Sequence, residues 1–426
     1  MSDALKSAAE RFLAQAREQE PTPAFSELRR EGIAAFSEHG LPDTKQEEWR
    51  YTNVRPLAGI EWAALHEPLS PSRNAIEGVA TPIFACGLEV FVDGHHHPEL
   101  HGSPGASEVT ALGTASAPPA LLGQLADAKA HPFVALNGAL ASDGARVHVH
   151  GEDPRAVHLV FAQGSEDAAS HPRVVIDADP GSRGTIILDH VSLAGARHFS
   201  NSVVEIEVAE NASVDLIILQ RAGDASFHVG HVAGRVERNG RLRTHTISLG
   251  GRFVRNDLAV VLAGEGAECR MNGLYLGRGA GLIDNHTWVD HAVPHCTSDE
   301  LYKGVLAESS RGVFRGKVIV RPDAQKTDAR QSNSNLLLSD KAEINTKPQL
   351  EIYADDVKCS HGATIGRLDA EAIFYLRSRG VAEDDARAML TRGFAAEVLS
   401  SLPEPSLAEA MSALFVERLE AAEEAA

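Results

Sequence analysis

"ENASVDLI" at residues 210–217 and "RNGRLRTH" at residues 238–245 contain the repeated pattern that decides the fold. In each, a small residue at a turn, Ala212 or Gly240, comes just before a short run with the alternating pattern of a half-buried strand. The same pattern recurs in "DPRAVHLV" (153–160), "GSRGTIIL" (181–188), "GEGAECRM" (264–271) and "SDKAEINT" (339–346, with Ala342). Spacings of 28, 28, 28 and 27 residues separate Ala156, Gly184, Ala212, Gly240 and Ala267. A fixed period of this size predicts stacked coils that bury one another's faces.

Changes in composition and in the spacing of apolar residues divide the chain into three regions. Residues 1–83 are expected to form an N-terminal helical region with a linker, because apolar residues recur there at helical spacing. Residues 84–365 consist of short runs rich in Val, Ile, Leu and Thr, broken by Gly, Asp, Asn and Pro, and are expected to form a β core. Residues 366–426 return to helical spacing. The pattern favours a stacked β-helix for the core, but a β-sandwich or jelly roll also fits it.

The composition excludes several classes of protein. Forty basic and 59 acidic side chains give a formal charge of −19, which opposes binding to the phosphates of nucleic acids. No apolar run is long enough for a membrane span, and the first 20 residues lack the apolar segment of a secretory signal. Four cysteines without a C-x-x-C pair do not make a disulfide framework. We therefore expect a cytoplasmic protein with reduced thiols.

The clearest candidate for chemistry is "DDVKCSHGATIGRL" at residues 355–368. If this stretch continues a strand, Tyr353, Asp355, Val357, Cys359 and His361 share one face. A thiolate and an imidazole two residues apart can both reach one metal ion or sulfur species. Iron–sulfur and structural zinc sites need about four donors, so the rest must come from elsewhere in the chain or from a second subunit. The alternative interpretation is a packed thiol beside a hydrogen-bonded histidine.

A second region, "DNHTWVDHAVPHCTSDELYKG" (284–304), is dense in His286, His291, His295 and Cys296. Its spacings match no zinc signature, so it is only an auxiliary metal-site hypothesis beside the interpretation as an ordinary turn or strand edge. "GVFRGKVIV" (312–320) is not a nucleotide-binding loop, because the glycine spacing is short and Val318 replaces the Ser or Thr that binds magnesium. A G-x-S-x-G elbow is also missing from the sequence. We therefore expect no nucleotide bound by this chain and no autonomous enzyme.

The stretch "SSRGVFRGKVIVRPDAQKTDARQSNSNLLLSDKAEINTKPQLEIYADDVKCSHGATIGRLDAEAIFYLRSRGV" (309–381) resembles the core of the SufB/SufD family of iron–sulfur cluster assembly proteins. The resemblance continues through "AEDDARAMLTRGFAAEVLSSLP" (382–403). Weaker similarity to the family occurs in "LPDTKQEEWRYTNV" (41–54) and "PFVALNGALASDGARV" (132–147). "CSHGATIG" with Gly362, followed by "LDAEAIFYLRSRG", is similar to the SufD branch of that family. The resemblance implies a right-handed parallel β-helix flanked by N- and C-terminal helical regions, in agreement with the repeat.

The resemblance also implies a function. The chain is expected to be a non-catalytic scaffold that pairs with SufB through the β-helix and holds the ATPase SufC through its C-terminal helices. His361 is implicated in building a nascent, transient iron–sulfur cluster at the SufB interface, and Cys359 is the neighbouring thiol, so both are candidate metal ligands shared with SufB. Candidate contacts with SufC are Phe374, Met389, Leu390 and Phe394.

Three rival functions remain open at this point. A homodimer of the same family would pair two copies of one strand edge. A stand-alone metal-binding protein would bind iron without partners. A β-helix enzyme acting on polysaccharides would carry an acidic or calcium-lined groove along its coils.

Overall fold

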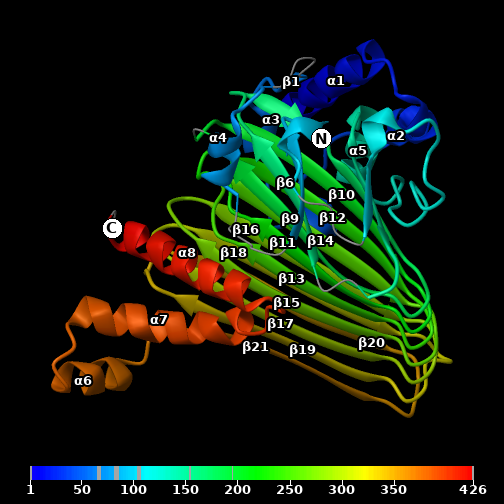
Figure 1. Ribbon diagram of the computed structural model, residues 1–426. Helices are drawn as coiled ribbons and strands as arrows, with labels where there is room; N and C mark the ends of the chain where they lie inside the picture. Colours follow the sequence, from blue (N-terminus) through cyan, green and yellow to red (C-terminus); the bar gives the residue numbers. More distant parts are fainter. Residues whose placement is uncertain are drawn as a thin grey trace.

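The computed structural model describes residues 2–64, 69–80, 86–102, 107–152, 155–193 and 195–424. The expected boundary between residues 83 and 84, and the first two residues of the repeat at 153–160, lie outside these ranges. Two large sheets face each other, and from β8 onward successive strands alternate between them (Figure 1). We call them sheet A and sheet B.

Sheet A contains β1 (Ala63–Ala64), β4 (Glu108–Ala111), β5 (Gly144–Val149), β7 (Ala168–Ser170), β8 (Arg173–Ala178), β10 (His198–Val208), β12 (Phe227–Val236), β14 (Phe253–Leu262), β16 (Leu282–His291), β18 (Arg311–Val320) and β20 (Glu343–Ile352). Sheet B contains β2 (Cys86–Val92), β3 (His95–His96), β6 (Ala156–Gln163), β9 (Arg183–Ser192), β11 (Ser213–Gln220), β13 (Arg241–Ser248), β15 (Glu268–Gly277), β17 (Thr297–Leu306), β19 (Asp328–Leu337) and β21 (Lys358–Gly366).

The helices lie toward the two ends of the chain and outside the sheets (Figure 1). They are α1 (Asp3–Glu18), α2 (Ser26–His39), α3 (Arg55–Ala58), α4 (Arg73–Glu77), α5 (Pro132–Leu140), α6 (Ala370–Ser378), α7 (Glu383–Leu399) and α8 (Pro405–Glu424). Short 3₁₀ turns occupy Pro23–Phe25, Glu47–Trp49, Pro98–Leu100 and Leu112–Thr114.

The sheets form a parallel solenoid of about eight turns, which confirms the predicted β-helix with helical regions at both ends. Ser213 pairs with Arg241, 28 residues later, and Arg241 pairs with Glu268, 27 residues later. These intervals equal the repeat read from the sequence. The β-sandwich and jelly-roll alternatives are excluded, because the long strands pair in parallel and the antiparallel pairs lie at the short strands β3 and β4.

Two small residues of the repeated sequence pattern lie at unexpected positions in the structure. Ala342 comes just before β20 in sheet A, whereas Ala212, Gly240 and Ala267 come before strands of sheet B. Gly184 pairs with Val214 rather than with Ala212, because that coil is longer. Small residues suit both corners of a coil, so composition alone does not identify the sheet that follows.

The interior between the sheets is filled by columns of inward-pointing side chains. Because side chains alternate along a strand, register partners on successive coils stack on the same face. Val214, Leu216 and Ile218 on β11 all belong to this core, and the columns on both sides of them are similarly buried. Stacking of coils therefore removes apolar surface from water that a single coil would leave exposed.

Helices cover part of the outer face of each sheet (Figure 1). Helices α1, α2 and α5 pack with Trp62 over sheet A, where Trp62 lies 5.7 Å from Phe199 and 5.4 Å from Phe227 between ring centroids. Helices α7 and α8 pack over sheet B through Val398, Phe415 and their neighbours (Figure 1). The open end of the solenoid, beyond β20 and β21, lies away from α1 and α2.

Buried histidines make the fold sensitive to acid. Burial lowers the pKa of His190, His198, His245 and His291 to about 4. In the unfolded chain these imidazoles bind protons below about pH 6.5, whereas the folded chain excludes them until about pH 4. We predict that Tm falls as the pH drops from 6.5 to 4, with each histidine contributing up to roughly 1.4 kcal/mol per pH unit.

Calorimetry across this pH range measures the effect. His245→Asn removes one of these groups and should give a shallower fall in Tm than the wild type. A Tm that is constant between pH 6.5 and 4 would contradict the neutral state of the buried imidazoles.

Candidate functional site

The last coil of the solenoid is uncovered. Strands β20 and β21 end their sheets, and among the described residues no further strand pairs with either of them. Each edge strand therefore keeps unpaired N–H and C=O groups along its outer side. The inward-pointing residues of this coil have the preceding coil on one side and no coil stacked on the other.

Cys359 and His361 lie on β21 at two of these inward positions. Cys359 pairs with Ala329 and His361 pairs with Gln331, and both partners are buried inside the solenoid. Cys359 is half-buried and His361 is exposed, because no coil covers them. The structure thus brings the predicted thiol and imidazole to one face of one strand at the open end.

The predicted strand was too long. Residues Tyr353, Asp355 and Val357 were expected to share the face of Cys359, but β20 ends at Ile352 and β21 begins at Lys358. The chain turns from one sheet to the other between them, with Gln325 Oε1 accepting from the Asp356 N–H at 2.9 Å. A solenoid must turn once between its two sheets, and two adjacent aspartates suit such a turn.

The Cys359 thiol is protonated in its present surroundings. Burial raises its pKa above the ordinary value, although a hydrogen bond from the backbone of Ala329 acts in the opposite direction. Only the thiolate binds metals or attacks sulfur, so binding at this position must release a proton. A bound ligand that carries positive charge, or that completes the metal site, is therefore needed to lower the pKa of Cys359 and release its proton.

A polar column lies directly beneath His361, and the sequence patterns did not identify it. Gln331 is the register partner of His361, and Glu300 is the partner of Gln331 one coil further in. The buried carboxylate of Glu300 accepts from Thr287 Oγ1 at 2.6 Å and from Gln331 Nε2 at 3.0 Å. Burial raises its pKa to about 7. The Gln331 amide fills the space beside Gly316, where a Cβ would stand 2.2 Å from Nε2.

The histidine-rich region at 284–304 does not form one site. His291 points inward, with Nε2 at 2.8 Å from Ser298 Oγ, and Cys296 is buried. His295 is exposed in a turn with φ +61°. His286 lies in the middle of β16, the strand that ends at His291, and faces outward. Within the part of the chain that the structure describes, no group of three His, Cys, Asp or Glu residues could hold a metal ion.

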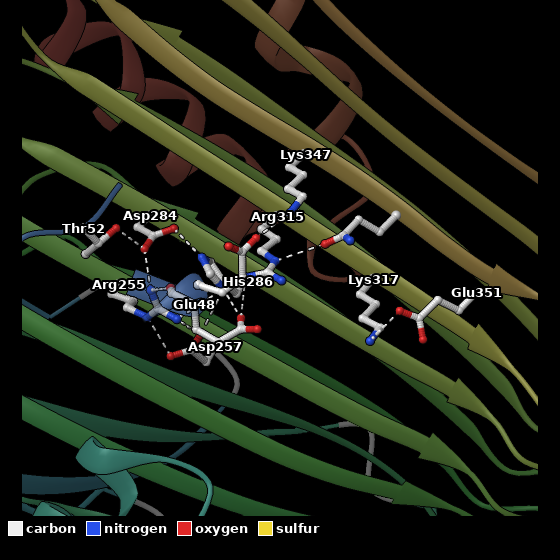
Figure 2. Close-up of polar contacts among 12 residues, drawn as sticks. Glu48, Thr52, Arg255, Asp257, Asp284, His286, Arg315, Lys317, Lys347 and Glu351 are labelled. Atoms are coloured by element: carbon white, nitrogen blue, oxygen red, sulfur yellow. Dashed lines mark hydrogen bonds and ion pairs between the residues drawn. The ribbon is translucent and has the colours of Figure 1, made fainter. Parts of the chain in front are cut away.

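His286 instead belongs to an ion network on the outer face of sheet A (Figure 2). Its Nε2 lies 3.0 Å from Asp284 Oδ1, and Arg255 Nη1 lies 2.7 Å from Asp284 Oδ2. Burial and Arg255 lower the pKa of His286, but Asp284 and Glu48 outweigh them and the net shift is upward. Thr52 Oγ1 donates to Asp284 at 2.5 Å. The network therefore fastens the segment 47–52 to the coils.

The segment 47–52 also reaches the last strand of sheet A. Trp49 lies under the Arg255 guanidinium at 3.8 Å, and Glu48 Oε2 lies 2.8 Å from Arg315 Nη1 on β18. Lys347 on β20 pairs with Glu47 at 2.6 Å. The N-terminal region thus contacts residues close to the open end, about 300 positions away in sequence.

The four residues proposed to bind a partner lie at different depths. Helix α6 has no buried residue, and Phe374 is 73% exposed. Met389 on α7 is 44% exposed, and Leu390 is half-buried. Phe394 packs partly on the solenoid, with Lys303 Nζ 4.6 Å from its ring centroid. Phe374 and Met389 are thus the two most accessible members of the set.

Two models of known protein families match this chain. Residues 160–394 match the model described as "SUF system FeS cluster assembly, SufBD core domain", and residues 12–92 match the "SufBD protein N-terminal region". The core match covers more than half of the chain. The chain belongs to the SufB/SufD family.

Relatives in the family are similar along nearly the whole chain. The iron–sulfur cluster assembly protein SufD of Escherichia coli is 35% identical over 388 residues, which cover 89% of this chain and 90% of that protein. An iron–sulfur cluster assembly SufBD family protein of Synechocystis is 33% identical over 387 residues, covering 86% and 85%. The family resemblance seen in residues 309–381 is therefore confirmed. Among the described residues, the helices are too short or too polar to cross a membrane.

The position of Cys359 predicts its reactivity. Among the cysteines whose side chains are described, Cys269 and Cys296 are buried and Cys359 is half-buried. We expect iodoacetamide to modify Cys359 before the other two. The rate should rise roughly tenfold per pH unit between pH 7 and 9, because the thiol is protonated over this range.

Mass spectrometry of tryptic peptides measures the modification, and Cys359→Ser identifies the peptide. A rate that is already constant above pH 7 would show a stabilised thiolate and contradict the raised pKa of Cys359.

Proposed function

We propose that this chain is the non-catalytic scaffold half of a two-chain site for iron–sulfur cluster assembly, with a SufB-type chain as the other half. Family membership supports a role in iron–sulfur cluster assembly. The observation that carries the finer proposal is the uncovered last coil, which presents Cys359 and His361.

The open end needs a partner for physical reasons. Ile352 and Ile365 occupy positions that continue buried inward columns, yet they are 41% and 53% exposed. Exposed apolar residues beside two unpaired strand edges favour association with another chain. A second solenoid placed end to end would cover these side chains and extend both sheets. A homodimer is the competing assembly, and the experiment below separates the two.

The nascent cluster is the cargo of this site. His361 supplies an imidazole nitrogen to iron, and Cys359 supplies a sulfur once its proton is released. Two donors cannot complete a cluster, so thiolates of the partner chain supply the others. The shared site explains why this chain presents a thiol and an imidazole at an end rather than in a closed pocket.

Helices α6 and α7 are proposed to bind the ATPase subunit, SufC. Phe374 and Tyr375 on α6 are 73% and 58% exposed, and Met389 on α7 is 44% exposed. Large exposed apolar side chains on a helix are typical anchors for a groove on a partner. The same helical region packs on sheet B through α7 and α8, so movement of a bound ATPase reaches the solenoid.

Replacement of His361 tests the proposed site. We predict that His361→Ala, co-expressed with SufB and SufC, gives as much complex as the wild type but roughly tenfold less iron and acid-labile sulfide. The size of the loss follows from removing a ligand, since even residues that only support ligands contribute tenfold or more.

Ser360→Ala is the matched control, because Ser360 lies on the same strand with its side chain on the opposite face. Equal cluster content in His361→Ala and Ser360→Ala would place the chemistry wholly in the partner. Recovery of homodimers alone from the wild-type co-expression would favour the homodimer.

Replacement of Phe374 tests the ATPase contact. We expect Phe374→Asp to abolish capture of SufC by this chain in a two-component pull-down, because a carboxylate replaces a large apolar anchor. Tyr353→Asp is the control, since Tyr353 is a similarly exposed aromatic residue (61%) at the open end. Undiminished capture by Phe374→Asp would show that α6 is not the contact.

A further inference from the structure

One corner of the solenoid interior is polar in its first coils. His190 and Gln220 are successive partners in one inward column of sheet B. Phe161 on β6 is the partner of His190 on the preceding coil, and Gln163 is the next inward residue of β6. Ser170, Ser200 and His228 are successive partners in an inward column of sheet A, and Ser202 follows Ser200 on the same face. The ring centroids of His190 and His228 lie 4.6 Å apart. The two columns therefore face each other in one place.

All seven side chains are deeply buried, each at most 4% exposed. Nine of their polar atoms have no hydrogen-bond partner within the described part of the chain. These atoms are Gln163 Oε1 and Nε2, Ser170 Oγ, His190 Nδ1, Ser200 Oγ, Ser202 Oγ, Gln220 Oε1 and Nε2, and His228 Nδ1.

Such a cluster cannot be an accident of packing. Buried polar groups in native proteins are paired with protein or water in the large majority, and unpaired ones number only a few per hundred residues. Here nine lie together in one corner. The next coil shows the alternative, because Asn256 Nδ2 donates to Ser248 Oγ at 3.2 Å and to Asn285 Oδ1 at 3.0 Å. Among the described residues the first coils lack such a ladder, which leaves water as the natural partner of these atoms.

The chemistry of the corner selects a neutral ligand. Burial lowers the pKa of His190 to about 4 and that of His228 well below its ordinary value, so both rings are neutral at pH 7. The amides and hydroxyls supply donors and acceptors together. Gly230 leaves room for the His228 ring, because a Cβ at this position would stand 2.9 Å from His228 Nε2. A small molecule that both donates and accepts, without charge, fits this lining.

We propose that the corner formed by Gln163, Ser170, His190, Ser200, Ser202, Gln220 and His228 binds a cluster of ordered water molecules. These waters are structural components of the first coils and connect the two sheets through hydrogen bonds. The inference is independent of the proposed role in cluster assembly.

A high-resolution crystal structure of the wild-type chain tests the proposal directly. We expect ordered waters within hydrogen-bonding distance of the nine atoms. A dry corner, or side chains that pair with one another without water, would overturn the proposal.

A pair of variants gives an independent test by the sign of the change. Gln220→Met removes two groups that bind water and should lower Tm by about 2 °C or more relative to Leu216→Met. Leu216 is the control because it is a buried apolar core residue of the same strand. If the corner is dry, Gln220→Met removes an unpaired buried amide, and Tm should rise above that of the control. That result would overturn the proposal even if the crystal structure were ambiguous for weakly occupied waters.

Discussion

Hydrogen bonding between successive coils is the constraint on which the rest of the structure depends. From β8 up to the last coil, each coil pairs in parallel with its neighbours, and the same stacking buries the inward side chains. A ladder of this kind has no internal way to end. At the first coils the N-terminal helices, with Trp62 and its aromatic neighbours, pack over the outer face of sheet A. At the last coil, β20 and β21 keep their free edges, and Ile352 and Ile365 stay exposed. The position of Cys359 and His361 is a consequence of that unfinished end.

The interior of the solenoid is not uniformly apolar. The stacking of coils alone does not explain where its polar side chains lie. Nine unpaired atoms at about 1–3 kcal/mol each would cost as much as, or more than, the roughly 5–15 kcal/mol that stabilises a typical domain, so we infer that water accompanies them. At the opposite end, Glu300 and Gln331 replace the apolar residues Leu216 and Met271 of the same column. An apolar core would be simpler to stabilise. A polar column directly under His361 is consistent with a role for the open end in chemistry.

Much of this architecture was accessible from the sequence, because periodicity reports local geometry. The 28-residue period predicted the coils, and the C-x-H spacing predicted that Cys359 and His361 share a face. The turn at residues 353–357 was missed because its residues also fit a strand. The ion network of Glu48, Arg255 and Asp284 was not predictable, since its members come from segments more than 200 positions apart. The exposure of Phe374 and the partial burial of Phe394 likewise depend on how α7 docks on sheet B. The role in iron–sulfur cluster assembly was predicted from family resemblance, because periodicity carries no information about function.

The central claim is that the last coil is completed by a strand of another chain. Hydrogen–deuterium exchange of peptides covering residues 343–366 measures this directly, comparing the isolated chain with its complex with SufB. The account predicts strong protection of β20 and β21 on complex formation, because their free N–H groups become paired, while β11 and β13 in the interior change little. Unchanged exchange of β20 and β21 in a stable complex would contradict the account and place the interface elsewhere.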